Sequence, residues 1–270
     1  MTENEYNQAE GVRRSDLWRM NDSPEKYKYF LANPPDATPA LTFGAACHKM
    51  ILEPETFGDE YAIAPACDRR TKDGKALFEA FMRGNEDKTI ISAEDAKVMA
   101  DMETALNRCS LAHSLIHEDG ETEVPFFWTD GETGEKCKVK LDRLINGDDG
   151  RKYVVDYKTA ACADTDRFNG EIWKLGYYLQ AAMYTEAVMT CLKLDYRPTF
   201  LFVVQEKKAP YSVNVIEVTE DVMNAGIAKF HELLEKLHEC KAVDMYPGYV
   251  DDVPNETYLP GWVSLGEEDE

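Results

Sequence analysis

The sequence contains no pair of cysteines in a C-x-x-C spacing, and its seven cysteines stand singly along 270 residues. An odd number of scattered cysteines is not typical of a disulfide framework or of a structural zinc site. We therefore expect reduced thiols. They stand at Cys47, Cys67, Cys109, Cys137, Cys162, Cys191 and Cys240.

Long apolar runs are also absent. The longest, such as residues 199–204, fall far short of the roughly 20 residues that a membrane-spanning helix needs. Residues 1–11 are polar and acidic, without the basic start and the apolar stretch of a secretory signal. These features predict a protein of the cytoplasm that has no membrane partner.

Positive charge is scarce, since 30 lysines and arginines stand against 51 aspartates and glutamates, for a formal charge of −21. Because nonspecific DNA binding depends on neutralising phosphates, this balance opposes an extended nucleic-acid surface. Any contact with DNA must therefore be local. Basic residues cluster at Lys136–Arg143 and Lys207–Lys208, while Asp251–Asp252 and Glu267–Glu270 add peripheral acid.

Residues 12–118 have the capping residues and the three-to-four spacing of helices, and they predict a mainly helical N-terminal layer. Ser15 is expected to cap a short helix. One long amphipathic helix is predicted over residues 92–117. Residues 56–88 are polar and weakly periodic, and they are predicted to be a connection between helices.

Residues 119–242 change to the pattern of strands. Three antiparallel strands joined by turns are predicted first, then one helix over residues 166–192, two more strands and a last helix. The strands are expected at residues 123–129, 137–145, 152–158, 199–205 and 211–218. We expect a single α/β domain over residues 1–270, which ends in an acidic tail over residues 243–270.

The strongest signal for chemistry is the run Val154–Lys158, V-V-D-Y-K. Alternate side chains of a strand share a face, so Asp156 and Lys158 are expected to project together. Asp142 stands 14 residues before Asp156, in the preceding strand and across a Gly-Asp-Asp-Gly turn. The antiparallel return of the chain can bring both carboxylates to one cation.

Two carboxylates and a lysine among apolar neighbours need a shared purpose, because an unpaired buried charge costs several kcal/mol. Hydrolysis of a phosphodiester supplies such a purpose. Carboxylates hold Mg²⁺, the ion polarises the phosphoryl oxygen and acidifies a water molecule, and a lysine orients that water or stabilises developing charge. The alternative is a buried ion-pair cluster that serves the fold alone.

Five elements follow one another along the sequence: Gly44-x-x-x-His48, Glu123, Asp142, Asp156-Tyr157-Lys158 and Gln180-x-x-x-Tyr184. In this order they resemble the RecB-type branch of the PD-(D/E)XK nucleases. Within it the sequence is similar to the C-terminal nuclease domain of RecE, exonuclease VIII, a group common in phages and prophages. The resemblance spans residues 15–240 and implies a restriction-endonuclease-like core, with a central mixed sheet flanked by helices.

The resemblance implies that Asp142 and Asp156 are metal ligands and that Lys158 is the catalytic lysine. His48 would add a contact to the metal or to a phosphate. The implied ion is Mg²⁺, with Mn²⁺ as a substitute. Aspartate stands at position 156 where many relatives have glutamate, but its shorter side chain can still bind a metal. The four spaced cysteines of the iron–sulfur relatives are missing, so no iron–sulfur cluster is expected.

Gln180 and Tyr184 stand one helical turn apart and so share a face. The resemblance implies that they hold or orient DNA, and that Glu123 is an acidic residue beside the site. Structural alternatives exist for each auxiliary residue. A histidine such as His48 is often a satisfied structural residue, Glu123 fits an exposed strand position, and Tyr184 belongs to a helical apolar stripe.

The function that the resemblance implies is a magnesium-dependent exodeoxyribonuclease. It would degrade linear double-stranded DNA from 5′ to 3′ and leave single strands for recombination. The implied partners are double-stranded DNA ends, a single-strand annealing recombinase and further copies of the chain in a ring-shaped homo-oligomer. An acidic outer surface around a basic channel would reconcile the charge of −21 with DNA binding.

Three alternatives have other functions. The chain could be an endonuclease or single-strand nuclease of the same superfamily, or a non-catalytic acidic interaction protein or DNA mimic that retains the fold. The intact set of Asp142, Asp156 and Lys158 argues against a non-catalytic interaction protein or DNA mimic. A hydrolase of small phosphoesters lacks support, because no G-x-x-x-x-G-K-[ST] or G-x-G-x-x-G loop is found.

Overall fold

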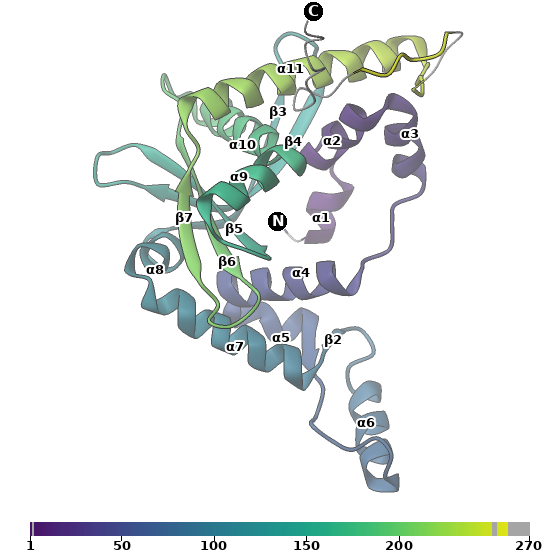
Figure 1. Ribbon diagram of the computed structural model, residues 1–270, viewed down its shortest axis with the longest axis vertical. Helices are drawn as coiled ribbons and strands as arrows, with labels where there is room; N and C mark the ends of the chain where they lie inside the picture. The colour runs from purple at the N-terminus through teal and green to yellow at the C-terminus, as the bar shows by residue number, and fades with distance from the viewer. Residues whose placement is uncertain (2, 250–252, 259–270) are drawn as a thin grey trace, which may run out of the picture.

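The computed structural model describes residues 1, 3–249 and 253–258, so part of the predicted acidic tail lies outside the described residues. Its centre is a five-stranded sheet in which only β5 and β6 run parallel (Figure 1). The strands, in spatial order, are β3 Gly120–Thr129, β4 Lys136–Asn146, β5 Lys152–Ala160, β6 Thr199–Glu206 and β7 Val213–Glu217. The expected α/β fold with a mixed sheet is confirmed.

Alternating apolar residues of the central strand β5 hold two layers of helices against the sheet. Val154 packs on one face with α10 (Tyr177–Leu192) and α11 (Glu220–Val243). Val155 and Tyr157 pack on the other face with α4 (Pro39–Leu52), α7 (Ala93–Arg108) and α8 (Ser110–His117). The sheet is therefore buried on both faces, and polar side chains on it need partners.

Three short helices form the N-terminal part of the chain. They are α1 (Glu3–Gln8), α2 (Arg14–Asp22) and α3 (Pro24–Ala32). Ser23 caps α3 as a serine before a proline predicts, since its hydroxyl accepts a hydrogen bond from the Lys26 N–H. The expected cap at Ser15 is wrong. The chain enters α2 at Arg13, whose N–H donates to the Asp16 side chain at 3.0 Å, so Ser15 lies inside the helix.

Two predicted long helices are each divided in two. The helix expected over residues 92–117 is interrupted at Cys109, between α7 and α8. The helix expected over residues 166–192 is split into α9 (Thr165–Lys174) and α10 by Gly176, which has a φ of +69°. A left-handed residue ends helical hydrogen bonding, and glycine adopts it at little cost. Because of this break, α10 runs in a different direction from α9 and crosses the sheet beside β5.

The predicted connection over residues 56–88 is also wrong. It contains the short helix α5 (Phe57–Glu60), strand β1 (Tyr61–Ile63) and α6 (Lys72–Arg83). It is flanked by the short helix η1 (Pro54–Thr56) and by strand β2 (Thr89–Ile91), which pairs in parallel with β1. Thr71 caps α6, which projects away from the sheet (Figure 1). The helical period of α6 is present in its sequence, and the polar stretches on either side of it led to the wrong prediction. No described helix has the length and apolar character that spanning a bilayer requires.

The close packing of α10 on α11 gives a test of the fold. A Cβ at Gly226 in α11 would lie 2.2 Å from the Tyr178 carbonyl oxygen, whereas one at Gly170 in α9 would meet nothing within 4 Å. We expect Gly226→Ala to lower the free energy of unfolding by about 1–3 kcal/mol through overpacking. Gly170→Ala should raise it by about 0.5–1 kcal/mol, the gain of alanine over glycine in a helix. Equal midpoints of both variants in denaturant unfolding would contradict this packing.

Candidate active site

A cleft of about 1120 Å³ lies where the sheet meets α4 and α10. Five of the predicted site residues line it, each from a different element. They are His48 of α4, Glu123 of β3, Asp142 of β4, Lys158 of β5 and Tyr184 of α10. The fold thus brings together residues that are up to 136 positions apart in the sequence.

Asp142 occupies the point at which β4 and β5 separate. The pairing of the two strands runs only as far as Arg143 and Val155, although both strands continue. Beyond that point the Tyr157 N–H donates to Asp142 Oδ2 at 2.8 Å instead of to the neighbouring backbone. His48 Nε2 lies 2.8 Å from the same oxygen. The carboxylate is therefore held from two sides.

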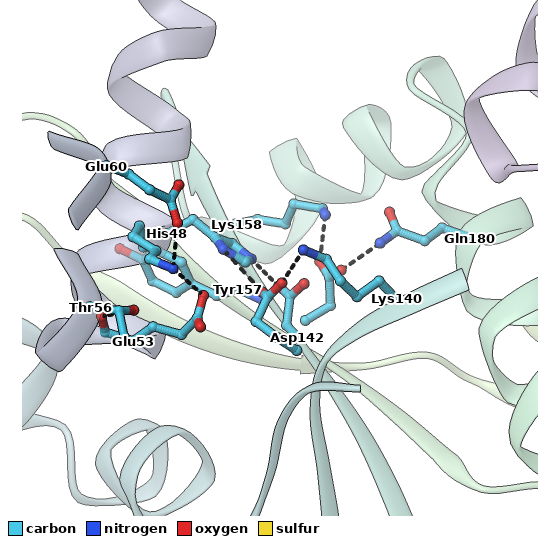
Figure 2. A network of polar contacts seen from close by, with 12 residues as sticks. His48, Glu53, Thr56, Glu60, Lys140, Asp142, Tyr157, Lys158 and Gln180 are labelled. Carbon is cyan, nitrogen blue, oxygen red and sulfur yellow. Dashed lines mark hydrogen bonds and ion pairs between the residues drawn. The ribbon is translucent and has the colours of Figure 1, made fainter. Parts of the chain in front are cut away.

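The charges around Asp142 and His48 stabilise one another (Figure 2). Burial opposes ionisation of Asp142, but the charge and hydrogen bond of His48 outweigh it and lower the pKa of the carboxyl. Burial likewise opposes protonation of His48, yet Asp142 and Glu123 raise its pKa to about 9. In the metal-free protein the pair is therefore an imidazolium and a carboxylate at neutral pH.

Asp156 lies deeper and has different partners. Its side chain is 1% exposed, Oδ1 accepts a hydrogen bond from Gln180 Nε2 at 2.5 Å, and Oδ2 lies 2.5 Å from Lys158 Nζ. The predicted common face of Asp156 and Lys158 is confirmed by this contact. Burial and the nearby Asp142 raise the pKa of Asp156 to about 6. Burial acts to lower the pKa of Lys158, but the two carboxylates raise it on balance.

Glu123 joins His48 and Asp142 in a group whose ligand atoms all lie within 4.8 Å of one another. The sequence grouped Asp156 with Asp142 and His48 as metal ligands, and that role of Asp156 stays a prediction. In the structure Glu123 completes the group with His48 and Asp142, and Asp156 contacts Lys158 and Gln180. Carboxylate oxygens with one imidazole nitrogen form a donor set that suits a hard or borderline divalent cation. The residues present therefore fit a metal centre.

Glu123 reaches this group through an unusual backbone. Its φ is +54°, and its neighbours Thr122 and Val124 keep their pairing with β4. A left-handed conformation costs a residue other than glycine roughly 1–2 kcal/mol. Such a local cost persists only where the surrounding structure enforces it, and it is concentrated at functional sites. Lys140 forms an ion pair with the Glu123 carboxylate, which offsets part of the cost of its burial.

Gln180 and Tyr184 lie on the face of α10 that is directed to β5, as their spacing predicts. Gln180 is 5% exposed and acts on Asp156 directly. Tyr184 lines the cleft, with its ring against Phe200. The positions fit the auxiliary roles that the resemblance implies, and those roles stay predictions.

Two further cleft residues escaped the sequence analysis. Lys140 pairs with Glu123, and the Tyr177 ring centroid lies 5.0 Å from Lys158 Nζ. Lys140 stands two residues before Asp142 on the same strand, and Tyr177 stands almost one helical turn before Gln180. Extending the two-residue strand period and the helical period from the predicted site would have found both.

Metal binding by this group can be measured through stability. Mn²⁺ or Mg²⁺ should raise the melting temperature of the wild type, because a ligand that binds only the folded state stabilises it. Asp142→Asn and Glu123→Gln should remove most of the shift. Asp101→Asn, at an exposed carboxylate paired with Lys97 on α7, is the matched control. Equal shifts in the control and the two site variants would place the metal elsewhere.

The metal-induced rise in melting temperature should also depend on pH. The raised pKa of His48 means that its pair with Asp142 stabilises the metal-free protein fully below pH 6.5 and that this contribution is lost as pH rises through about 9. A metal must displace the His48 proton before it binds. The metal-induced rise in melting temperature should therefore be larger at pH 9 than at pH 7, and a smaller rise at pH 9 would exclude His48 as a ligand.

Comparisons with known proteins agree with this fold. Among solved structures, the fold matches the crystal structure of a protein named "Putative exonuclease" from Eubacterium rectale, with a TM-score of 0.62, 14% identity and 96% coverage of each chain. At this identity the match shows a common fold alone. A structure of SSO0001 gives a TM-score of 0.40 at 15% identity, over 87% of this chain and 81% of that one, which is too low to support an argument.

A search of the curated proteins found no match to the sequence. The sequence does match a protein family over residues 15–254, which is most of the chain and includes every residue of the cleft described above except Met1 and Tyr6. The description of that family names the superfamily to which the order of His48, Asp142, Asp156 and Lys158 pointed. The chain belongs to the family of PDDEXK-like domains of unknown function (DUF3799).

Proposed function

We propose that this protein is a metal-dependent nuclease that hydrolyses DNA phosphodiesters, and that it acts as an exonuclease on the ends of linear duplex. The observation that carries the proposal is the meeting of two groups in one cleft. His48, Glu123 and Asp142 form a cation site, and the ion pair of Asp156 and Lys158 lies next to it. Family membership supports a nuclease fold for this chemistry.

Each polar residue has a task in this proposal. A divalent cation held by His48, Glu123 and Asp142 would supply the charge that polarises a phosphoryl oxygen and eases attack by water. Lys158 presents its ammonium group at the cleft wall, where it stabilises negative charge that develops on the phosphate. Gln180 fixes Asp156 through Oδ1, so that Oδ2 stays directed at Lys158.

Binding of a phosphate in this cleft would depend on the metal ion. Lysines line it together with a larger number of acidic residues, and Lys140 and Lys158 are paired with Glu123 and Asp156. A divalent cation held by the carboxylates would supply the positive charge that a phosphate-bearing substrate needs, despite the net charge of −21. The cost of burying Asp156 and Lys158 also favours catalysis over a purely structural or DNA-mimicking role, since a well-packed apolar pair would serve stability as well or better.

The finer parts of the proposal rest on the resemblance to RecE. They are cleavage from 5′ to 3′, Mg²⁺ as the working ion, a recombinase that receives the single strands, a ring-shaped homo-oligomer and a cytoplasmic location. Of these, only the choice of ion has support from the structure, since the donor set of His48, Glu123 and Asp142 suits a hard or borderline divalent cation.

The proposal is tested by incubating the protein with Mg²⁺ and duplex DNA labelled at either 5′ or 3′ ends, beside closed circular duplex and single strands. Linear duplex should be shortened from its 5′ ends, circular duplex should survive, and EDTA should abolish the activity. Cutting of the circle would make the protein an endonuclease. Intact DNA in every arm, with a folded protein that binds Mg²⁺, would contradict the nuclease.

The role of Lys158 is tested in the same experiment with a variant. Lys158→Ala should slow cleavage by about 10²–10⁴-fold, the range for loss of an electrostatic or acid–base group. The metal-induced rise in melting temperature should survive, because Lys158 is not in the ligand group. Lys229→Ala, at a lysine of α11 that pairs with Glu232, is the control. Near-normal cleavage by folded Lys158→Ala would return Lys158 to a structural role.

A further inference from the structure

A second, smaller cavity of about 290 Å³ lies beside the active site, between the start of α2 and the face of α10. Lys158, Tyr177 and Tyr184 line both this cavity and the large cleft. Lys158 therefore stands at the boundary between the two spaces. Arg14 and Ser15 of α2 line only the smaller cavity, which we call the Arg14 cavity.

Arg14 is held rigidly and lacks a counter-ion. Its Nη2 donates to the Leu175 carbonyl at 2.5 Å, and its guanidinium carbon lies 5.5 Å and 6.0 Å from the ring centroids of Tyr177 and Trp18. Its Nε is buried without a hydrogen-bond partner. In the described part of the chain Arg14 forms no ion pair with a carboxylate. Arg14 is half-buried at the cavity wall, and with one N–H engaged by Leu175 and the Nε shielded, its remaining guanidinium N–H groups are left to bind an anion.

The other positive groups of the cavity are already engaged. Lys138 donates to the carbonyls of Tyr6, Asn7 and Ala9, and Arg13 pairs with Asp16 at 3.3 Å. Arg14 is therefore the group with capacity for a ligand, and its planar fork matches phosphate oxygens. Ser15 adds an exposed hydroxyl at the same wall. The N-terminus of the nine-residue helix α2 contributes a positive dipole there.

We propose that the Arg14 cavity binds a phosphate group of the substrate strand, next to the phosphate that is cleaved in the large cleft. This inference rests on the proposed nuclease function, because the ligand is part of the same DNA strand. The strand would pass Lys158 and the rings of Tyr177 and Tyr184 and place its next phosphate on Arg14. That phosphate is either a terminal 5′-phosphate or an internal phosphodiester, which share the same oxygen chemistry.

Three variants in the Arg14 cavity distinguish the effect of charge on phosphate binding from the effects of side-chain shape and of misfolding. Arg14→Gln removes the charge, and Arg14→Lys keeps the charge but loses the planar fork. Ser15→Asp puts a negative charge at the cavity wall in the first turn of α2, where an acidic residue stabilises a helix. It therefore weakens phosphate binding without endangering the fold. Arg19→Gln is the matched control, because Arg19 lies on the same helix, stacks on Phe30 and lines neither cavity.

The test measures equilibrium binding with Ca²⁺ in place of Mg²⁺, for short duplexes with 5′-phosphate ends, 5′-hydroxyl ends or ends closed by hairpins. Arg14→Gln and Ser15→Asp should weaken binding by about tenfold to a hundredfold, the size of a lost charge-assisted hydrogen bond. Arg14→Lys should fall between them and the wild type, and Arg19→Gln should bind as the wild type does. Melting curves show that each variant is folded.

The pattern among the three duplexes identifies the phosphate. A wild-type preference for 5′-phosphate over 5′-hydroxyl ends, which Arg14→Gln abolishes, assigns the cavity to a terminal phosphate. Equal weakening on all three duplexes assigns it to an internal phosphodiester. Wild-type affinity of Arg14→Gln and Ser15→Asp for every duplex would overturn the inference. Cleavage by the wild type with Mg²⁺ is scored separately, so absence of cleavage counts against the proposed nuclease and not against the Arg14 cavity.

Discussion

The separation of β4 from β5 at Asp142 and Asp156 is the constraint on which the rest of the site depends. A charged side chain on a sheet that is buried on both faces needs partners that offset its desolvation. Here the backbone ladder stops, and the Tyr157 N–H is satisfied by the Asp142 carboxylate in place of a carbonyl. The Asp142 side chain thus satisfies a backbone donor that the sheet leaves unpaired, and it also places a negative charge at the bottom of the cleft.

The buried charges are kept ionised by compensation within two adjoining groups (Figure 2). Asp156 is balanced by Lys158 and oriented by Gln180, while Asp142 is balanced by His48. A divalent cation bound by the second group would replace the His48 proton and raise the charge of the group by one unit. In the metal-free protein that proton already offsets part of the carboxylate charge, which explains how the cluster can be stable without a metal.

Sequence periodicity predicted the parts of the site that share one element. Asp156 and Lys158 follow from the two-residue period of a strand, and Gln180 with Tyr184 from the helical turn. The approach of His48 could not be derived from spacing, because it depends on how α4 packs on the sheet, and only the family resemblance indicated it. The left-handed backbone of Glu123 leaves no mark in the sequence.

Other features were hidden for physical reasons. Gly176 lies inside an otherwise continuous helical pattern, and only packing against Trp18 shows that it ends a helix. In the sequence, Arg14 has the features of an ordinary surface arginine. One of the aromatic rings that contact it comes from a distant part of the chain, and the other becomes its neighbour only when the helix forms. Helix α6 was overlooked although Leu77, Phe78, Phe81 and Met82 recur at the three-to-four spacing of a helix.

The central claim is that His48, Glu123 and Asp142 form the cation site, and crystals grown with Mn²⁺ test it most directly. Anomalous scattering locates manganese without assumptions about the protein. The account predicts a manganese peak in direct contact with the carboxylates of Asp142 and Glu123, with His48 released from its pair with Asp142. A protein that retains the His48–Asp142 pair and binds manganese only at its acidic surface would contradict the account.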